Sequence, residues 1–221
     1  MKKKILITGS NGNIGSFLCK NLSNNYHLIK VDKEFDFDDS HKLSKLMSQK
    51  IYAIIFAHGH NSTPSKNAKK KNFLDEKEIL NFFHTNFFLN LKIIKYYLNK
   101  NKFGRVINFS SIYSIKAPKH FIYKNFDKDI GYSTSKAAAN MMMSYLGTKF
   151  GKKFLFNSII LGGVKTKNLD KYFLKNYEKN SPLGRMIKLN EILPAIKFLL
   201  DEDNKHTNAQ NIPVEGGWLA W

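Results

Sequence analysis

Near its start the chain reads Lys4-Ile5-Leu6-Ile7-Thr8-Gly9-Ser10-Asn11-Gly12-Asn13-Ile14-Gly15. The apolar run predicts a short strand, and the residues that follow the glycines predict a helix. Glycines between a strand and a helix let the backbone turn sharply and approach a pyrophosphate, which then lies on the helix amino terminus. The spacing is Gly-x-x-Gly-x-x-Gly rather than Gly-x-Gly-x-x-Gly, so a plain glycine-rich turn is the alternative interpretation.

The rest of the chain alternates short apolar runs with longer helical stretches, which is typical of a parallel sheet flanked by helices. Strands are expected at 4–8, 27–32, 53–57, 105–110, 154–161 and 211–214. Helices are expected at 14–24, 40–49, 75–99, 132–150 and 190–200. Irregular stretches are expected at 59–72, 113–131 and 162–180, after strand ends where open α/β sheets bind ligands. The pattern predicts an α/β protein with one domain over 1–221, a doubly wound parallel sheet of the Rossmann type with helices on both faces.

Asp32 ends the second predicted strand, at the distance expected for an acid that binds the ribose 2′-hydroxyl of a dinucleotide. A carboxylate there repels a 2′-phosphate, so we predict NAD as the cofactor in preference to NADP. Lys33 follows directly and opposes this preference. A solvated strand end is the alternative interpretation of Asp32.

Tyr132 and Lys136 lie at positions i and i+4 of a predicted helix and therefore share one face. A free phenol has a pKa of about 10, and nearby lysine and nicotinamide cations would favour the phenolate. Such a tyrosine can take a proton from an alcohol as hydride leaves, or give one to a carbonyl in the reverse direction. Ser111, at the end of the preceding predicted strand, could hydrogen-bond the reacting oxygen.

These residues occur in the order typical of the short-chain dehydrogenase/reductase family, which the chain resembles over nearly its whole length. The carboxyl-terminal part adds Leu161-Gly162-Gly163-Val164-Lys165-Thr166, Pro182-Leu183-Gly184-Arg185 and Glu215-Gly216-Gly217-Trp218. The resemblance implies that Ser111 polarises the substrate oxygen, Tyr132 is the acid/base, and Lys136 holds the nicotinamide ribose. It implies that Asn86 anchors a water in the proton relay. The implied cofactor contacts are Gly9, Asn11, Gly12, Asn13, Ile14, Gly15, Asp32, Asp36, Phe37, Ala57, Gly59, Tyr132, Lys136, Val164 and Thr166. Of these, Asp36 and Phe37 match the adenine contacts, and Val164 and Thr166 the nicotinamide contacts.

The chain departs from the family pattern at several positions. Phe56-Ala57-His58-Gly59 replaces Asn-Asn-Ala-Gly, so no asparagine is expected to brace this strand. Leu161 replaces a proline and Glu215 an aspartate. The segment between Ser111 and Tyr132 is longer than usual, and it resembles that of bacterial flagellin-modification enzymes near sialic-acid-like sugar pathways.

The formal net charge is +19, with Lys and Arg together numbering 36. This charge has three possible explanations: compositional drift, attraction of an anionic small substrate, and nucleic-acid binding. Only Arg105 and Arg185 are arginines, which disfavours a specific nucleic-acid reader. A positive mouth of the site is expected from the loop lysines Lys66, Lys69, Lys116, Lys119, Lys124, Lys165 and Lys167.

The remaining features bear on location and assembly. Cys19 is the sole cysteine, and we see neither a signal peptide nor a membrane-spanning run, so a cytoplasmic protein without metal or membrane partners is expected. His58 is expected to line the cofactor pocket rather than to bind a metal with His60. A homodimer or homotetramer is expected through 75–99 and 132–150, because of the aromatic residues Phe82, Phe83, Phe87, Phe88, Tyr96 and Tyr97. The run Met141-Met142-Met143 is expected in the core or at that interface.

The sequence thus predicts an NAD(H)-dependent oxidoreductase that interconverts a secondary alcohol and a ketone on a small-molecule substrate. A sugar or nucleotide sugar for a surface glycan is the expected substrate. A reductase of 3-oxoacyl thioesters or other anionic ketones is the alternative enzyme. A catalytically silent dinucleotide sensor or polyanion-binding protein is the alternative of another class, and the presence of Ser111, Tyr132 and Lys136 argues against it.

Overall fold

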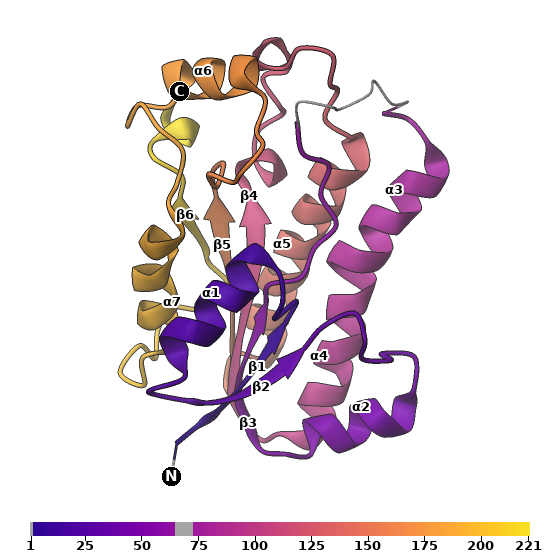
Figure 1. The fold of residues 1–221 in the computed structure, drawn as a ribbon. Helices are drawn as coiled ribbons and strands as arrows, with labels where there is room; N and C mark the ends of the chain where they lie inside the picture. The colour runs from indigo at the N-terminus through magenta and orange to yellow at the C-terminus, as the bar shows by residue number, and fades with distance from the viewer. Residues whose placement is uncertain (1, 65–72) are drawn as a thin grey trace.

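The computed structural model describes residues 2–64 and 73–221 (Figure 1). Its centre is a parallel sheet of six strands in the order β2-β1-β3-β4-β5-β6. The strands are β1 (Lys4–Thr8), β2 (His27–Val31), β3 (Ile51–Phe56), β4 (Gly104–Ser111), β5 (Phe154–Leu161) and β6 (Asn211–Val214). The predicted doubly wound parallel sheet is therefore confirmed, with strand ends within two residues of those expected.

The strand order reverses between β1 and β3. The chain moves outward from β1 to β2, returns to the other side of β1, and then continues outward from β3 to β6. In open α/β sheets a ligand binds in the crevice that this reversal opens at the carboxyl ends of the strands. The glycine-rich turn follows β1, so the topology places it at that crevice.

β2 is an edge strand. The order 3-2-1-4-5-6, common in dinucleotide-binding folds, has a further strand beyond the second one. In the described part of this chain, β2 is instead followed by the short helix α2 (Ser40–Met47) and then by β3, which pairs with β1 on its other side. Only Val31 of β2 is buried. The sheet region that would lie under the adenine end of a dinucleotide is thus narrower than in that order.

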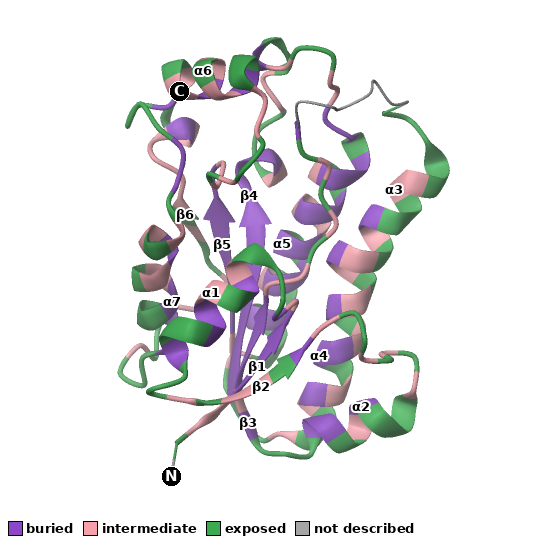
Figure 2. Ribbon diagram, viewed as in Figure 1, coloured by how far each residue is buried: buried purple, intermediate pink, exposed green. Residues whose placement is uncertain are grey.

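Helices cover both faces of the sheet (Figures 1 and 2). α1 (Asn13–Leu22) and α7 (Leu193–Leu200) pack on one face, where Leu18, Leu22 and Ile196 join the strand residues in one apolar cluster. On the other face α2 packs with α4 (Leu89–Lys100) and α5 (Ile130–Phe150). The four inner strands, β1, β3, β4 and β5, are buried from both sides, as expected of near-continuous apolar runs in a parallel sheet. In the described part of the chain, every helix is too short or too polar to cross a bilayer.

The helix predicted over 75–99 consists of two α-helical segments joined by a π-helical turn. α3 (Glu76–Phe83) leads into the turn His84–Phe88, and α4 continues from it. The turn carries Asn86, which is buried. Single π turns inside α-helices occur often at functional sites, because they re-aim the side chains that they carry.

The prediction of an irregular stretch at 162–180 is wrong in its second half, because α6 spans Lys171–Asn180. Asp170 caps this helix by accepting a hydrogen bond from the Phe173 backbone N–H at 2.9 Å. Phe173 and Tyr177, one turn apart, bury its inner face against Trp218 and Met186. Two apolar contacts among many polar residues give a weak periodic signal, so the sequence pattern did not reveal the helix. α6 lies beyond the carboxyl ends of β4 and β5 (Figure 1).

Candidate active site

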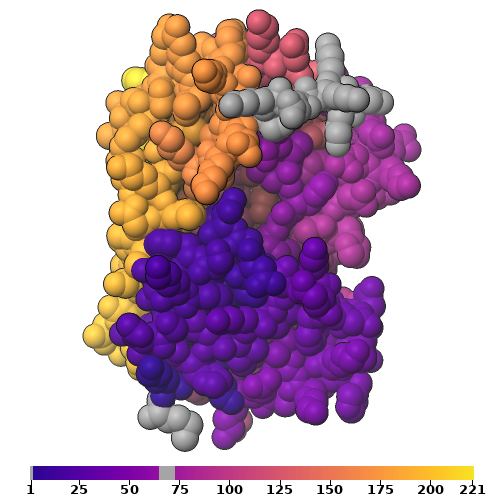
Figure 3. Space-filling view, viewed as in Figure 1, coloured from indigo at the N-terminus to yellow at the C-terminus, as the bar shows by residue number. Residues whose placement is uncertain are grey.

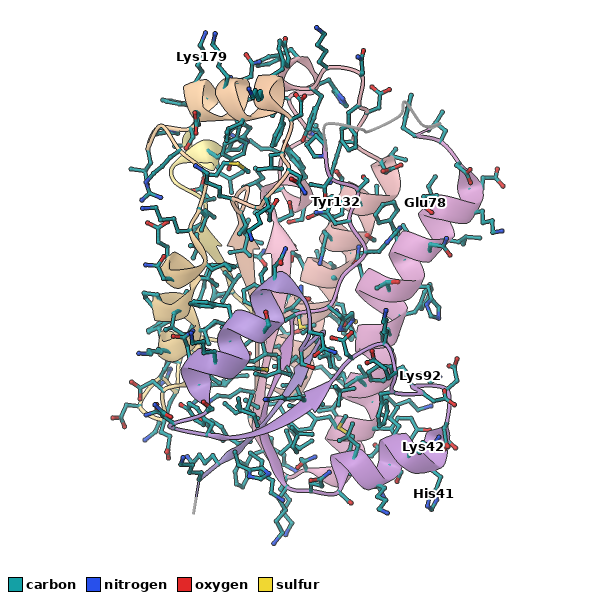
Figure 4. All side chains as sticks on the ribbon, in the orientation of Figure 1. His41, Lys42, Glu78, Lys92, Tyr132 and Lys179 are labelled. Carbon is teal, nitrogen blue, oxygen red and sulfur yellow. The ribbon has the colours of Figure 1, made fainter. Side chains whose placement is uncertain are left out.

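A cavity of about 410 Å³ opens at the carboxyl edge of the sheet. It is lined by the glycine-rich turn, the ends of β3, β4 and β5, the first turn of α5, and segments on either side of α6. In Figure 3 a recess is visible between the indigo atoms of the amino-terminal segment and the orange atoms near α6. Tyr132 lies beyond the end of β4 (Figure 4). The site is therefore where the strand order predicts a ligand.

The glycine-rich turn is closed so tightly that two of its positions exclude a side chain. Gly9 has φ of 65°, and a Cβ at Gly15 would lie 2.0 Å from the Gly9 carbonyl oxygen. Gly12 begins α1 without any side-chain cap, and the first turn of the helix holds no acidic residue. The backbone N–H groups of that turn are thus left for a ligand, and an anionic group is what they favour. The residues present fit a pyrophosphate.

Asp32 follows β2 and is connected to the glycine-rich turn. Its carboxylate accepts hydrogen bonds from the Asn11 N–H at 2.7 Å and from the Lys33 N–H at 2.8 Å. The bond from Asn11, and then that from Lys33, holds the pKa of the Asp32 carboxyl below its usual value. Asp32 is therefore ionised at neutral pH and lies beside the turn, although it does not line the cavity itself.

His58 braces the strand at the position where an asparagine was expected. The Thr8 hydroxyl lies 2.6 Å from His58 Nδ1, and His58 Nε2 lies 3.2 Å from the Thr85 carbonyl oxygen. Since a carbonyl only accepts, the proton is on Nε2 and the Thr8 hydroxyl donates to Nδ1. Burial, and after it the charge of Lys136, lowers the pKa of His58 to about 4. No asparagine braces this strand, as expected, but a neutral histidine takes that place: His58 links β1 to the π turn and also lines the cavity.

Tyr132 is in the first turn of α5, and only 9% of it is exposed. Burial raises the pKa of its phenol, and a hydrogen bond with the Ser111 hydroxyl opposes this rise. The phenol is therefore protonated at neutral pH in the protein alone. This differs from the expectation of a phenolate, which included the charge of a bound nicotinamide. Ser111 ends β4 and lines the same cavity.

Lys136 and Asn86 both lie next to Gly59, and of the two only Lys136 lines the cavity. The Lys136 ammonium donates to the Phe109 carbonyl oxygen at 2.9 Å, and burial lowers the pKa of this lysine to about 8. The Asn86 side chain accepts from the His60 N–H at 3.0 Å and donates to the Ser135 hydroxyl at 3.0 Å. A Cβ at Gly59 would come within 3.2 Å of Asn86 Oδ1 and 3.3 Å of Lys136 Nζ, so glycine keeps this corner open.

The other cofactor residues expected from the sequence fall into two groups. Those that line the cavity, besides Ser111, Tyr132 and Lys136, are Gly12, Asn13, Ile14, Ala57, Gly59, Val164 and Thr166. Asp36 and Phe37 lie elsewhere, around a separate hollow next to α4. Asp36 accepts hydrogen bonds from the backbone N–H groups of Asp38 and Asp39, and Phe37 packs edge-to-face on Phe35. Both residues lie in the segment after β2. In the described chain β2 is the edge strand, so no further strand of the sheet lies next to this segment.

Among the described residues, the expected mouth lysines Lys116, Lys119, Lys124, Lys165 and Lys167 do not line the cavity. Lys116 donates to the carbonyl oxygens of Leu219 and Trp221, and Lys119 lies over the Trp218 ring. Lys66 and Lys69 lie outside the described residues. The cation that sequence reasoning missed is Lys128, which lines the cavity and is only 7% exposed. Its spacing of four residues before Tyr132 was the available signal.

Comparison with known proteins identifies the family. A sequence model described as enoyl-(acyl carrier protein) reductase, of the short-chain dehydrogenase type, matches residues 52–219. The chain belongs to the short-chain dehydrogenase/reductase family. It is thus an oxidoreductase. Post-translational flagellin modification protein A of Campylobacter coli is 25% identical over 98% of both chains. A 3-oxoacyl-[acyl-carrier-protein] reductase of Aquifex aeolicus is 22% identical over 96% of this chain and 86% of its own.

Solved structures of this family share the fold. A short-chain dehydrogenase from Leptospira borgpetersenii with bound NAD⁺ superposes with a TM-score of 0.84 at 22% identity, over 99% of this chain and 93% of that one. ElxO with NADP bound superposes with a TM-score of 0.82 at 19% identity, over the full length of both chains. Solved structures with this fold thus carry either dinucleotide.

Proposed function

We propose that this protein interconverts a secondary alcohol and a ketone with NAD(H), on a sugar or nucleotide sugar used for a surface glycan. The observation that carries the reaction is the convergence of Ser111, Tyr132 and Lys136 on one cavity beside the glycine-rich turn. When bound, the dinucleotide supplies or accepts the hydride. The near-full-length similarity to a flagellin modification protein supports the sugar. A cytoplasmic location remains part of this proposal.

The chain's own residues handle the oxygen of the substrate. The Ser111 hydroxyl is placed to hydrogen-bond that oxygen and to hold it next to the Tyr132 phenol. Because the phenol is protonated at neutral pH, Tyr132 can give its proton to a carbonyl oxygen in the direction of reduction. Lys136 and Asn86 keep their places through the bonds to Phe109, His60 and Ser135, which hold this corner of the site rigid.

A screen of ketones with NADH, followed by the fall in the cofactor's near-ultraviolet absorbance, tests this function. Keto sugars and nucleotide-linked keto sugars should be reduced fastest. Acetoacetyl thioesters form the second arm, since the family description and the Aquifex relative favour an acyl-thioester reductase as the alternative. Faster reduction of the thioesters would replace the sugar proposal, and the absence of any oxidation of NADH would contradict the oxidoreductase reaction.

We propose that NAD is preferred to NADP because of Asp32. Its carboxylate is ionised and held beside the glycine-rich turn by Asn11 and Lys33, where a 2′-phosphate would meet like charge. We expect the wild type to bind NAD at least several-fold more tightly than NADP in calorimetry. Asp32→Ala should narrow the ratio, whereas Asp36→Ala, which removes a carboxylate from the same segment, should leave it unchanged. Equal affinities in the wild type would show that Lys33 outweighs Asp32.

We also propose a homo-oligomer through the long helices, but with different residues from those expected. Phe82 and Tyr97 are fully buried in the core. Met142 and Met143 are also buried there. The exposed apolar residues of this face are Leu80, Phe88 and Leu91 before or on α4, and Met141, Tyr145 and Phe150 on α5. Three of them, Phe88, Leu91 and Phe150, line a groove between the two helices. Exposed apolar residues gathered on neighbouring helices are typical of an interface.

Light scattering at micromolar concentration should therefore give at least a dimer. Leu91→Glu should shift the protein to monomers, because it buries a charge in the proposed interface. Phe198→Glu, at an exposed apolar position on α7 of the opposite face, should leave the mass unchanged. A monomeric wild type would refute this interface.

A further inference from the structure

Lys128 is a buried cation that the proposed proton transfer does not use. It lies four residues before Tyr132, just ahead of α5, and its side-chain nitrogen is 3.8 Å from the centroid of the Tyr132 ring. The ammonium donates to the Ser62 carbonyl oxygen at 2.6 Å and to the Asn61 side-chain oxygen. Burial lowers the pKa of Lys128 to about 7, and the neighbouring Asp129 opposes this. With this pKa, Lys128 is only partly charged at neutral pH in the protein alone, and an anionic group bound beside it would favour its ammonium form.

The surroundings of Lys128 leave it able to bind a further group. An ammonium has three N–H donors, and the described residues give it two acceptors. Among the described residues that line the cavity there is no aspartate or glutamate, while Lys128 and Lys136 both line it. The Ser62 hydroxyl, also in this lining, is buried and has no hydrogen-bond partner among the described residues. Two cations and an unpaired hydroxyl around a cavity without carboxylates favour an anionic ligand.

The position of Lys128 fixes where the negative charge of such a ligand lies. The substrate oxygen must reach the Tyr132 hydroxyl, and the ammonium lies against the ring that carries this hydroxyl. The charged group is therefore only a few bonds from the reacting carbon. A charge at the far end of a long substrate would not reach Lys128.

We propose that Lys128 determines specificity by binding an oxyanion group of the substrate, a carboxylate or a phosphate close to the reacting carbon. This inference rests on the proposed function and narrows its substrate class to small anionic ketones and hydroxy compounds. A merely structural lysine would hold the Asn61–Ser62 segment and would affect neutral and anionic substrates alike. Binding of the two kinds of substrate therefore separates the roles.

Calorimetry on the enzyme–NAD⁺ complex provides the test, because a ketone cannot be reduced by the oxidised cofactor. Dihydroxyacetone phosphate is compared with dihydroxyacetone, and levulinate with its methyl ester, so that the two pairs distinguish a phosphate from a carboxylate. We expect the wild type to bind the anion of at least one pair about tenfold more tightly than its neutral partner at low salt. Lys128→Met should abolish this preference and leave the neutral ketones unaffected, and Lys128→Arg should retain part of it.

Lys124→Met is the matched control, since Lys124 is an exposed lysine of the same segment and does not line the cavity. It should leave the preference intact. The absence of any preference in the wild type, or an equal loss for neutral and anionic ketones in Lys128→Met, would overturn the inference. Failure of the proposed function would appear separately, as the absence of NADH oxidation in the screen of keto sugars and thioesters.

Discussion

Tyr132→Phe should lower kcat by about 10²–10⁴-fold while leaving dinucleotide affinity nearly unchanged. The variant removes one hydroxyl and keeps the ring that packs edge-to-face on Phe82 and under the Lys128 ammonium. The loss therefore falls on the transition state, in which the phenol gives up its proton, and not on binding of the ground state. Steady-state kinetics on the fastest ketone of the screen, together with calorimetry for the cofactor, measures both effects.

Tyr113→Phe is the matched control. Tyr113 lines the same cavity and is 8% exposed, but its hydroxyl is paired with that of Tyr123 at 2.7 Å. Its loss should change kcat by far less than the loss of the Tyr132 hydroxyl. A Tyr132→Phe variant that keeps more than about a tenth of wild-type kcat would remove Tyr132 from the role of a general acid.

Acidification should destabilise the protein through His58. The folded protein holds the pKa of His58 at about 4, below the ordinary 6.5 that applies when the chain is unfolded. Above about pH 6.5 the His58 ring is neutral in both the folded and the unfolded state. Between about pH 6.5 and about pH 4 the unfolded chain takes up a proton at this ring, whereas the folded protein does not. The free energy of unfolding therefore falls as the pH is lowered, by about 2 kcal/mol from this group between about pH 7 and about pH 5.

Urea denaturation of His58→Asn at both pH values tests this effect. The variant should be less stable than the wild type near neutral pH, because the bridge between Thr8 and Thr85 is altered, and its stability should depend less on pH. His41→Asn removes an exposed histidine and should keep the wild-type dependence. An unchanged pH dependence in His58→Asn would show that another group governs acid stability.

The sequence predicted the sheet and the order of the site residues because both follow from strong local patterns. The strands are short, mainly apolar runs, and three of them, β1, β5 and β6, begin and end at the predicted residues. Tyr132 and Lys136 had to share a helix face once the helix was recognised. The glycine-rich turn was recognisable because a Cβ at Gly15 has no room, which restricts this position to glycine.

Other features depended on tertiary contacts that no short pattern reveals. Lys128 looked like one lysine among many, and only the folding of Asn61 and Ser62 over it makes it a buried cation. Replacement of an asparagine by His58 looked like a loss, because the partners Thr8 and Thr85 are 50 and 27 residues away. The exposed aromatic face was overestimated, since the sequence could not distinguish the buried Phe82 from the exposed Phe88.

Hydride should pass directly between the nicotinamide and a carbonyl carbon held at Ser111 and Tyr132. The most direct measurement uses NADH that carries deuterium at the transferred position, with mass spectrometry of the alcohol formed from the fastest ketone. When the reaction runs in ordinary water, we predict one deuterium on the carbinol carbon of the product. This deuterium should remain after the hydroxyl proton has been exchanged. A product without deuterium at that carbon, or with deuterium there only when the solvent is heavy water, would contradict the account.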